Sequence, residues 1–273
     1  MKSLKPLIIG LAAMAYTAQA ELVQLIANDY DWSLNGYIEG AAQTSDSKLG
    51  LGTDFLRAYA DDLSSSSQIT TPVSGIDDAG SWDDNYVIVH NGGSSVYRVD
   101  LSTGFAQSSS SVNGTSVSGI SSVFNYNNAV CFAAIDSNDN TVKYFEWGNS
   151  TPIATGPNIG DNYTGLEILA NGTVTDLSQL AILVSRNLQD GAKMDQYFNG
   201  EVVESYRAAG TSIITDMSYD SESGLLTTSF KDGRSGGGLA NYDFSDHVVP
   251  EPATIGLFGL GAASAYFLRK KQH

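Results

Sequence analysis

The sequence predicts an all-β domain, and a repeat within it predicts a five-bladed β-propeller. Clusters of Gly, Ser, Thr, Asn and Asp separate short runs of Val, Ile, Tyr and Phe, as is typical of strands joined by turns. A short marker, most often Ser/Thr-Gly-Ile/Leu, recurs every 42 to 47 residues. Four short strands in such a period are typical of a propeller blade. The markers are Trp32-Ser33-Leu34, Ser74-Gly75-Ile76, Ser118-Gly119-Ile120, Thr164-Gly165-Leu166 and Thr211-Ser212-Ile213.

Each marker is followed by a polar turn and then by apolar runs that we expect to form the second and third strands of a blade. The first blade, from Leu34 to about Thr71, is the weakest repeat, with its best strand at 55–60. A two-sheet sandwich of similar length is the alternative fold. Second strands are expected at 86–90, 129–134, 180–184 and 225–230, and third strands at 96–101, 142–147, 193–198 and 239–244.

The fifth blade lacks an obvious outer strand at its C-terminal side. Residues 246–254 contain two prolines, which serve a strand ladder poorly. The segment Leu22–Ala27 is strand-like and precedes the first marker without a blade of its own. We therefore expect Leu22–Ala27 to pair beside 239–244 and to close the ring, which also removes an exposed strand edge.

The N-terminus has the pattern of a secretory signal peptide. Lys2 and Lys5 precede an apolar run at 7–16, which is too short to span a bilayer, and the small residues Ala18 and Ala20 follow. We expect signal peptidase to recognise Ala18 and Ala20 and to cleave after Ala20. The expected domains are thus a signal peptide at 1–20, the propeller at 21–248 and a tail at 249–273.

The tail combines three features in a fixed order. Two prolines hold its first segment extended and open to a protease. The apolar run 255–268 then spans roughly 21 Å as a helix, against a hydrocarbon core of about 30 Å, which suits a temporary anchor. A basic cluster follows and is expected to stop transfer on the cytoplasmic side. The extended motif is Val249-Pro250-Glu251-Pro252-Ala253-Thr254, and the cluster is Arg269, Lys270 and Lys271.

Together these features resemble the PEP-CTERM sorting signal of bacterial exosortase substrates, over about the last 25 residues. The resemblance implies export, transient anchoring in the inner membrane and cleavage near Pro250-Glu251-Pro252 by an exosortase-like membrane protease. It also implies a final place in the cell envelope, on the cell surface or outside the cell, in bacteria that make extracellular polysaccharide. It implies nothing about a ligand of the propeller.

Charge and cysteine content exclude several classes of function. Of 30 acidic and 14 basic residues, one acidic and five basic residues lie outside 21–249, so that region has a net charge of about −20. Such a surface repels nucleic acid and anionic lipid. Cys131 is the only cysteine, so no intramolecular disulfide forms, and we expect it to be a small buried residue.

Motifs with apparent chemistry have simpler interpretations. The run 136–140 starts like a calcium loop but has Thr141 and Trp147 where an EF-hand needs Gly and Glu, so we expect a hairpin turn. The run 233–237 fits a nucleophile elbow, with Asp243 and His247 downstream, but no helix is expected after it. His90, His247 and His273 lack metal spacing, and we predict no catalytic residue, metal site or cofactor beyond weak calcium binding.

Two kinds of motif that contain carboxylates allow both a functional and a structural interpretation. The adjacent pairs Asp61-Asp62, Asp77-Asp78 and Asp83-Asp84 could supply the two carboxyl groups, about 5–10 Å apart, that glycoside hydrolysis needs. Neighbours on an extended chain point to opposite sides and are poor partners for this chemistry, so we expect solvated turn residues. Trp82-Asp83-Asp84-Asn85-Tyr86 and Asp29-Tyr30-Asp31-Trp32 mix aromatic and acidic side chains, as sugar-binding sites do, or they cap a blade core.

We therefore expect a non-enzymatic, exported propeller that interacts with other molecules, with extracellular polysaccharide as a candidate partner. The alternative is a secreted glycosidase or lyase with its site in the propeller funnel. A third hypothesis is a matrix component whose acidic turns bind calcium. The fold alone does not choose among them.

Overall fold

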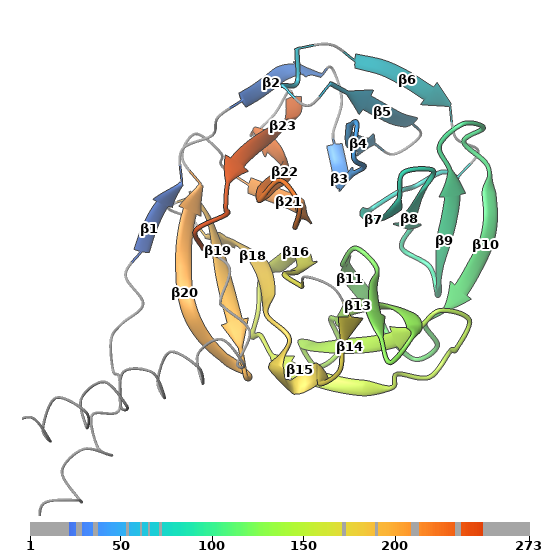
Figure 1. Ribbon diagram of the computed structural model, residues 1–273, viewed down its shortest axis with the longest axis vertical. Helices are drawn as coiled ribbons and strands as arrows, with labels where there is room; N and C mark the ends of the chain where they lie inside the picture. The colour runs from blue at the N-terminus through green and yellow to red at the C-terminus, as the bar shows by residue number, and fades with distance from the viewer. Residues whose placement is uncertain are drawn as a thin grey trace, which may run out of the picture.

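The computed structural model describes residues 22–247, except 26–28, 35–37, 53–54, 61, 65, 71–72, 171–172, 189–190, 209–212 and 233–235. These residues form a ring of five mainly antiparallel sheets around a central axis, which confirms the five-bladed propeller (Figure 1). The expected signal peptide at 1–20, including Ala18 and Ala20, lies outside the described residues. So do the sorting motif 249–254 and the cluster of Arg269, Lys270 and Lys271.

Three blades are built mainly as consecutive strands counted outwards from the axis. Blade 1 contains β3 (Ile38–Gln43), β4 (Lys48–Gly52), β5 (Phe55–Tyr59) and β6 (Ser66–Thr70). Blade 2 contains β7 (Asp78–Asp83), β8 (Tyr86–His90), β9 (Ser95–Asp100) and β10 (Ala106–Ser111). Blade 3 contains β11 (Val117–Ile120), β12 (Phe124–Tyr126), β13 (Ala129–Asp136), β14 (Thr141–Glu146) and β15 (Ala154–Asn158), with β17 (Thr173–Val174) beside β12.

The last two blades take a strand from the N-terminal segment. Blade 4 contains β16 (Tyr163–Ile168), β18 (Ile182–Leu188), β19 (Gly191–Phe198), β20 (Glu201–Ala208) and β1 (Leu22–Leu25), with the 3-10 helix η1 (Leu177–Gln179) between β17 and β18. Blade 5 contains β21 (Ile213–Asp220), β22 (Leu225–Asp232), β23 (Gly236–Asp243) and β2 (Asp29–Leu34). The second and third strands of blades 2 to 5 lie where the sequence predicts them, within a few residues.

The ring closes through the N-terminal segment, but the expected pairing was wrong. β2, at Asp29–Leu34, pairs antiparallel with β23 and completes blade 5. The segment Leu22–Leu25 instead pairs parallel with β20 and adds a fifth strand to blade 4 (Figure 1). Trp32-Ser33-Leu34 therefore belongs to an outer strand of blade 5 and does not begin blade 1, whose inner strand starts at Ile38.

Alternate side chains of each second strand pack against the two neighbouring blades. In β8, Val87 and Val89 pack into the cluster shared with blade 1, whereas Ile88 packs into the cluster shared with blade 3. Five such clusters exist, one at each interface between blades. Both faces of a blade are thus covered, and this explains why the second strands of blades 2 and 3 contain nearly continuous apolar runs. Cys131 on β13 is buried in the cluster between blades 3 and 4, as expected.

The inner strands approach each other so closely that glycine is required. A Cβ atom on Gly80 of β7 would lie 2.4 Å from the carbonyl oxygen of Ser121, and one on Gly165 of β16 would lie 2.8 Å from the Cα atom of Asp216. Real Cβ atoms do not come this close to backbone atoms, so either substitution would force the inner strands apart. The glycine of the repeated marker therefore has a structural reason in blade 4. In blade 2 the same role belongs to Gly80, because Gly75 lies in the turn before β7.

Candidate functional site

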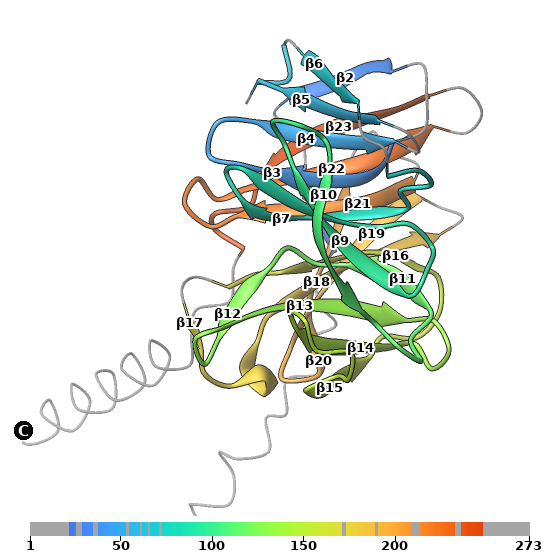
Figure 2. The same cartoon turned by 90° about the vertical axis from the view of Figure 1, so that its right-hand side faces the viewer.

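A shallow basin of about 670 Å³ lies at one end of the inner strands. Its walls come from the ends of β3, β7 and β21 and from the turns that follow them, in blades 1, 2 and 5. The lining residues are mostly polar: Gln43, Thr44, Ser45, Ser81, Trp82, Asp83, Asp84, Tyr219, Asp220, Ser221, Glu222 and Ser223. The turns that form it project from one side of the ring in the edge-on view (Figure 2).

Hydrogen bonds between the inner strands of different blades lie beneath the basin. The Gln43 backbone N–H donates to Ser81 Oγ at 2.8 Å, and Gln43 Nε2 donates to the Ser218 carbonyl at 2.6 Å. Ser81 Oγ and Ser218 Oγ lie 2.9 Å apart, and the Ser81 N–H donates to Ser122 Oγ at 3.1 Å. Residues of blades 1, 2, 3 and 5 thus form a polar floor.

Three buried carboxyl groups, from blades 2, 4 and 5, lie on the axis among the inner strands. Glu167 Oε2 accepts the Ser122 N–H at 3.0 Å, and its Oε1 accepts the Tyr219 N–H at 3.2 Å. Asp216 Oδ2 accepts the N–H groups of Ala41 and Ala79 at 2.8 and 3.2 Å. These carboxyl groups connect strands that belong to different blades, because each accepts backbone donors of its neighbours.

The third axial carboxyl, Asp78, accepts the Ile120 N–H and is close enough to Asp216 to titrate with it. Burial raises the pKa of Asp78 and of Asp216 well above the ordinary value, and the neighbouring Asp78 raises that of Asp216 further. Burial also raises the pKa of Glu167 to about 7. Two like charges in a low-dielectric site are costly, so the Asp78–Asp216 pair holds its protons to a higher pH than an exposed aspartate does.

The carboxylates of the basin have a different environment. Asp84 Oδ1 accepts the Ser45 N–H at 2.8 Å, and this hydrogen bond lowers the pKa of Asp84. Asp83 is held by the backbone N–H groups that follow it, and Asp220 by those of its own turn. Glu222 is exposed, and its carboxylate has no hydrogen-bond partner among the residues that the structure describes.

The three adjacent carboxylate pairs identified in the sequence lie in different environments. Asp77 is exposed while Asp78 is buried on the axis, so they point apart, as expected of neighbours on a strand, but the expectation that Asp78 is a solvated turn residue was wrong. Asp83 and Asp84 both line the basin. Asp62 accepts the Ser64 N–H in an exposed turn, and Asp61 lies outside the described residues.

The two motifs that mix aromatic and acidic residues lie in different parts of the propeller. Trp82, Asp83 and Asp84 line the basin, but the guanidinium of Arg98 covers the Trp82 ring at 5.0 Å and Trp147 packs against it edge-on at 4.8 Å. The ring is therefore packed into the blade 2–blade 3 interface, as the capping interpretation predicts. The segment Asp29–Trp32 lies in β2, at the outer edge of blade 5.

Other motifs take their simpler interpretation. Asp136 begins the hairpin turn between β13 and β14, where its Oδ1 accepts the N–H groups of Ser116 and Asn138. Gly236 begins strand β23, so no helix follows the elbow-like run. His90 is buried beside the Gly93 carbonyl, and His247 packs on Tyr206. Within the described part of the chain, no three His, Cys, Asp or Glu side chains form a metal-binding cluster.

The chain leaves the propeller beside the basin. The Phe244 N–H donates to the carbonyl of Gly224, which ends the turn whose residues 220–223 line the basin. Residues 248–271 match the family model of the PEP-CTERM protein-sorting motif. The chain carries a PEP-CTERM sorting signal. This signal implies export to the cell envelope or surface and recognition by an exosortase-type processing protein.

Comparisons of the whole PEP-CTERM protein reveal its fold but not its activity. The crystal structure of Myxococcus xanthus glutaminyl cyclase is similar, with a TM-score of 0.55 and 10% sequence identity over 81% of this chain and 97% of that one. At this identity the likeness supports the fold alone. No curated protein sequence matches the chain significantly. Among the described residues, no helix has the length and apolar character needed to cross a membrane.

Proposed function

We propose that this PEP-CTERM protein is an exported, non-enzymatic interaction module whose basin binds a neutral, hydroxyl-rich polymer such as extracellular polysaccharide. The basin offers carboxylates, serine and threonine hydroxyls and the half-buried Tyr219 ring on one open surface. Hydroxyl groups of a sugar donate to carboxylates and exchange hydrogen bonds with hydroxyls. The negative charge of the basin favours a neutral polymer over an anionic one.

One observation carries the choice of binding over hydrolysis. Glycoside hydrolysis needs a protonated carboxyl group next to a charged one, both in reach of the substrate. Asp84, which faces the basin, has a lowered pKa and is charged at neutral pH. Glu167, with a pKa of about 7, is 1% exposed and lies below the floor. The carboxyl groups that hold protons are thus separated from those that a substrate can reach.

A polysaccharide-active enzyme is the second candidate, and one observation favours it. Asp84 of blade 2 and Glu222 of blade 5 line the same basin, so carboxylates from different blades converge. An enzyme of this kind would release new reducing or unsaturated ends from the polymers that it binds. Incubation of the purified protein with those polymers, followed by an assay for such ends, tests the candidate, and their absence despite saturable binding favours the interaction module.

Binding is tested by isothermal titration with dextran and with alginate, a neutral and an anionic polymer. We expect dextran to bind and alginate to bind at least tenfold more weakly. Glu222→Gln removes an exposed basin charge and should change dextran affinity by several-fold. The matched control is Asp139→Asn, an exposed carboxylate in the β13–β14 turn at the opposite end of the inner strands. Equal affinities for both polymers, or equal effects of both substitutions, would contradict binding in the basin.

The route to the surface is the remaining part of the proposal. Signal peptidase would cut after Ala20, the tail would hold the protein transiently in the inner membrane with Arg269, Lys270 and Lys271 on the cytoplasmic side, and an exosortase would cut near Pro250-Glu251-Pro252. The intact mass of the protein recovered from the surface or medium should lack both ends, including about the last 20 residues. Recovery solely of a species that ends at His273 would disprove processing.

A further inference from the structure

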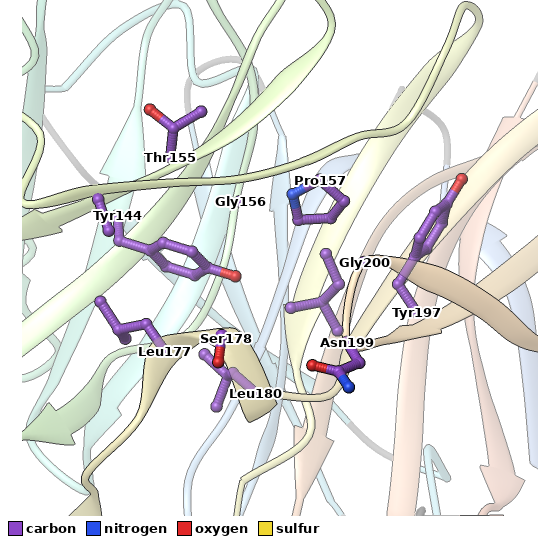
Figure 3. Close-up of a pocket in the computed structure, with 12 residues that line it drawn as sticks. Tyr144, Thr155, Gly156, Pro157, Leu177, Ser178, Leu180, Tyr197, Asn199 and Gly200 are labelled. Atoms are coloured by element: carbon purple, nitrogen blue, oxygen red, sulfur yellow. The ribbon is translucent and has the colours of Figure 1, made fainter.

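A second pocket, away from the axis, lies between blades 3 and 4 (Figure 3). Its volume is about 340 Å³, which is at the small end of the ~300–1,000 Å³ typical of small-molecule sites. One wall is formed by β14 and β15, and the other by η1, β18 and the turn between β19 and β20. The pocket therefore spans the interface of two blades, where small ligands often bind.

Tyr144 provides the polar group at the centre of this pocket. Its side chain is 2% exposed and its ring packs edge-on against Phe124 at 6.3 Å, while its hydroxyl points into the pocket (Figure 3). The hydroxyl has no hydrogen-bond partner among the described residues. Burial raises the pKa of Tyr144 to about 12, so the hydroxyl keeps its proton and remains a donor at physiological pH. Because this hydroxyl opens onto the pocket, the acceptor atom of a ligand can reach it and take the place of solvent there.

The neighbouring residues shape a space for a ring. A Cβ atom on Gly156 would lie 3.0 Å from Cε2 and from the hydroxyl oxygen of Tyr144, so a glycine is needed for this ring to lie where it does. Tyr197 points its own hydroxyl away, toward Tyr163 Oη at 3.0 Å, and so presents its ring to the pocket. Leu177 and Leu180 supply an apolar wall on the other side.

The walls of the pocket are uncharged. Among the described residues that line it there is no Asp, Glu, Lys, Arg or His, although the chain has 30 acidic residues. A charged ligand would lose its hydration there without gaining a counter-charge. An apolar ring would gain contact with Leu177, Leu180 and Tyr197, and a single polar group on it would meet the Tyr144 hydroxyl.

We propose that this interblade pocket binds a neutral, phenol-sized ring compound whose hydroxyl or carbonyl oxygen accepts a hydrogen bond from Tyr144. The site is distinct from the basin and does not depend on polysaccharide binding. The ring of the ligand lies between the Tyr197 ring and the leucines of the η1 segment. Selectivity comes from two features, the absence of charge in the walls and the single buried donor.

The test is isothermal titration of the secreted protein with p-cresol, toluene and 4-methylbenzoate, which share one ring and differ in their polar group. We expect saturable binding of p-cresol, at least tenfold weaker binding of toluene, and no measurable binding of 4-methylbenzoate. Tyr144→Phe removes the donor and should bring p-cresol and toluene within threefold of each other. Gly156→Ala displaces the Tyr144 ring and should weaken p-cresol binding at least tenfold.

Thr151→Ala is the matched control, since Thr151 is exposed in the turn between β14 and β15 and is not one of the residues that line the pocket. It should leave all three affinities unchanged, and thermal melts identify any variant that fails to fold. Because toluene needs no hydrogen bond, its continued binding to Tyr144→Phe shows that the pocket is intact. The proposal is overturned if neither p-cresol nor toluene binds saturably, or if Tyr144→Phe keeps the wild-type preference for p-cresol.

Discussion

Carboxyl groups serve opposite purposes at the axis of the propeller and in its surface turns. Asp78, Glu167 and Asp216 are at most 2% exposed, and burial raises the pKa of each. Asp100, in contrast, is partly exposed and Asp176 is exposed, and hydrogen bonds from the serine two residues further on lower the pKa of both. Burial dominates at the axis and local hydrogen bonding dominates in the turns.

The difference concerns what each carboxyl group holds together. Asp100 accepts from Ser102 and Thr103, which are its neighbours in sequence, so it stabilises one turn. Asp216 accepts from Ala41 and Ala79, which are more than 130 residues away and belong to two other blades. The axial groups thus secure the ring, and the turn groups secure single hairpins.

The largest effect should come from removing an axial acceptor. Asp216→Ala leaves the N–H groups of Ala41 and Ala79 buried without partners, and unpaired buried donors cost roughly 1–3 kcal/mol each, so we expect a loss of about 3 kcal/mol or more in the free energy of unfolding. Urea denaturation at pH 7 measures it. Asp216→Asn keeps one acceptor oxygen and should lose less.

The matched turn variant, Asp100→Ala, removes hydrogen bonds that water replaces, because their donors, Ser102 and Thr103, are exposed. Its loss should be clearly smaller than that of Asp216→Ala. Equal losses of unfolding free energy in both variants would mean that axial and turn carboxyl groups contribute equally to stability. That result would contradict the proposed difference between the axis and the turns.

The second effect is a pH dependence that Glu167 imposes. Its pKa is about 7 in the folded chain and 4.5 when exposed, so the folded state binds one more proton between these values. Stability therefore falls as pH rises from 4.5 to 7, by at most about 1.4 kcal/mol per pH unit and roughly 3 kcal/mol in total. Glu167→Gln should remove this part of the slope. An unchanged slope in urea titrations of the variant would show that Glu167 does not titrate in this window.

The third and smallest effect has the opposite sign. Because the pKa of Asp176 is lowered in the folded chain, the carboxylate stabilises above its ordinary value of 3.8, and this contribution is lost as pH falls through the folded pKa. Asp176→Asn should therefore reduce the loss of stability on acidification below pH 3.8. Thermal melts between pH 4.5 and 2 measure it, and a variant that loses stability as steeply as the wild type would argue against the turn effect.

Local features of the chain made much of the fold predictable. The second strands are buried on both faces, so their apolar runs and the spacing between them give the blade period directly. The Asp-x-Ser and Asn-rich turns between strands are visible because their hydrogen bonds stay within a few residues. The same locality explains why the 136–140 run was correctly interpreted as a hairpin turn.

Features that depend on distant strands were predicted less well. Both Leu22–Leu25 and Asp29–Leu34 have strand character, and which of them pairs with β23 depends on where the ring brings the N-terminal segment. Asp78 was expected, like Asp77, to be a solvated turn residue, because little in the local sequence marks it as axial. The one available signal was glycine two residues later, at Gly80, which reflects the close approach of inner strands. Tyr144 carried no sequence signal at all, because its pocket is formed by two blades.

The most direct test of the difference between axis and turns is a ¹³C NMR titration of the side-chain carboxyl carbons in the labelled protein. We expect Glu167 to titrate near pH 7 and the Asp78–Asp216 pair to titrate well above the ordinary aspartate value, while Asp100, Asp176 and Asp243 titrate below 3.8. Axial assignments come from the variants Glu167→Gln and Asp216→Asn. If every carboxyl carbon in the folded protein finished titrating below pH 5, the axial groups would be charged, and the account of how they secure the ring would be wrong.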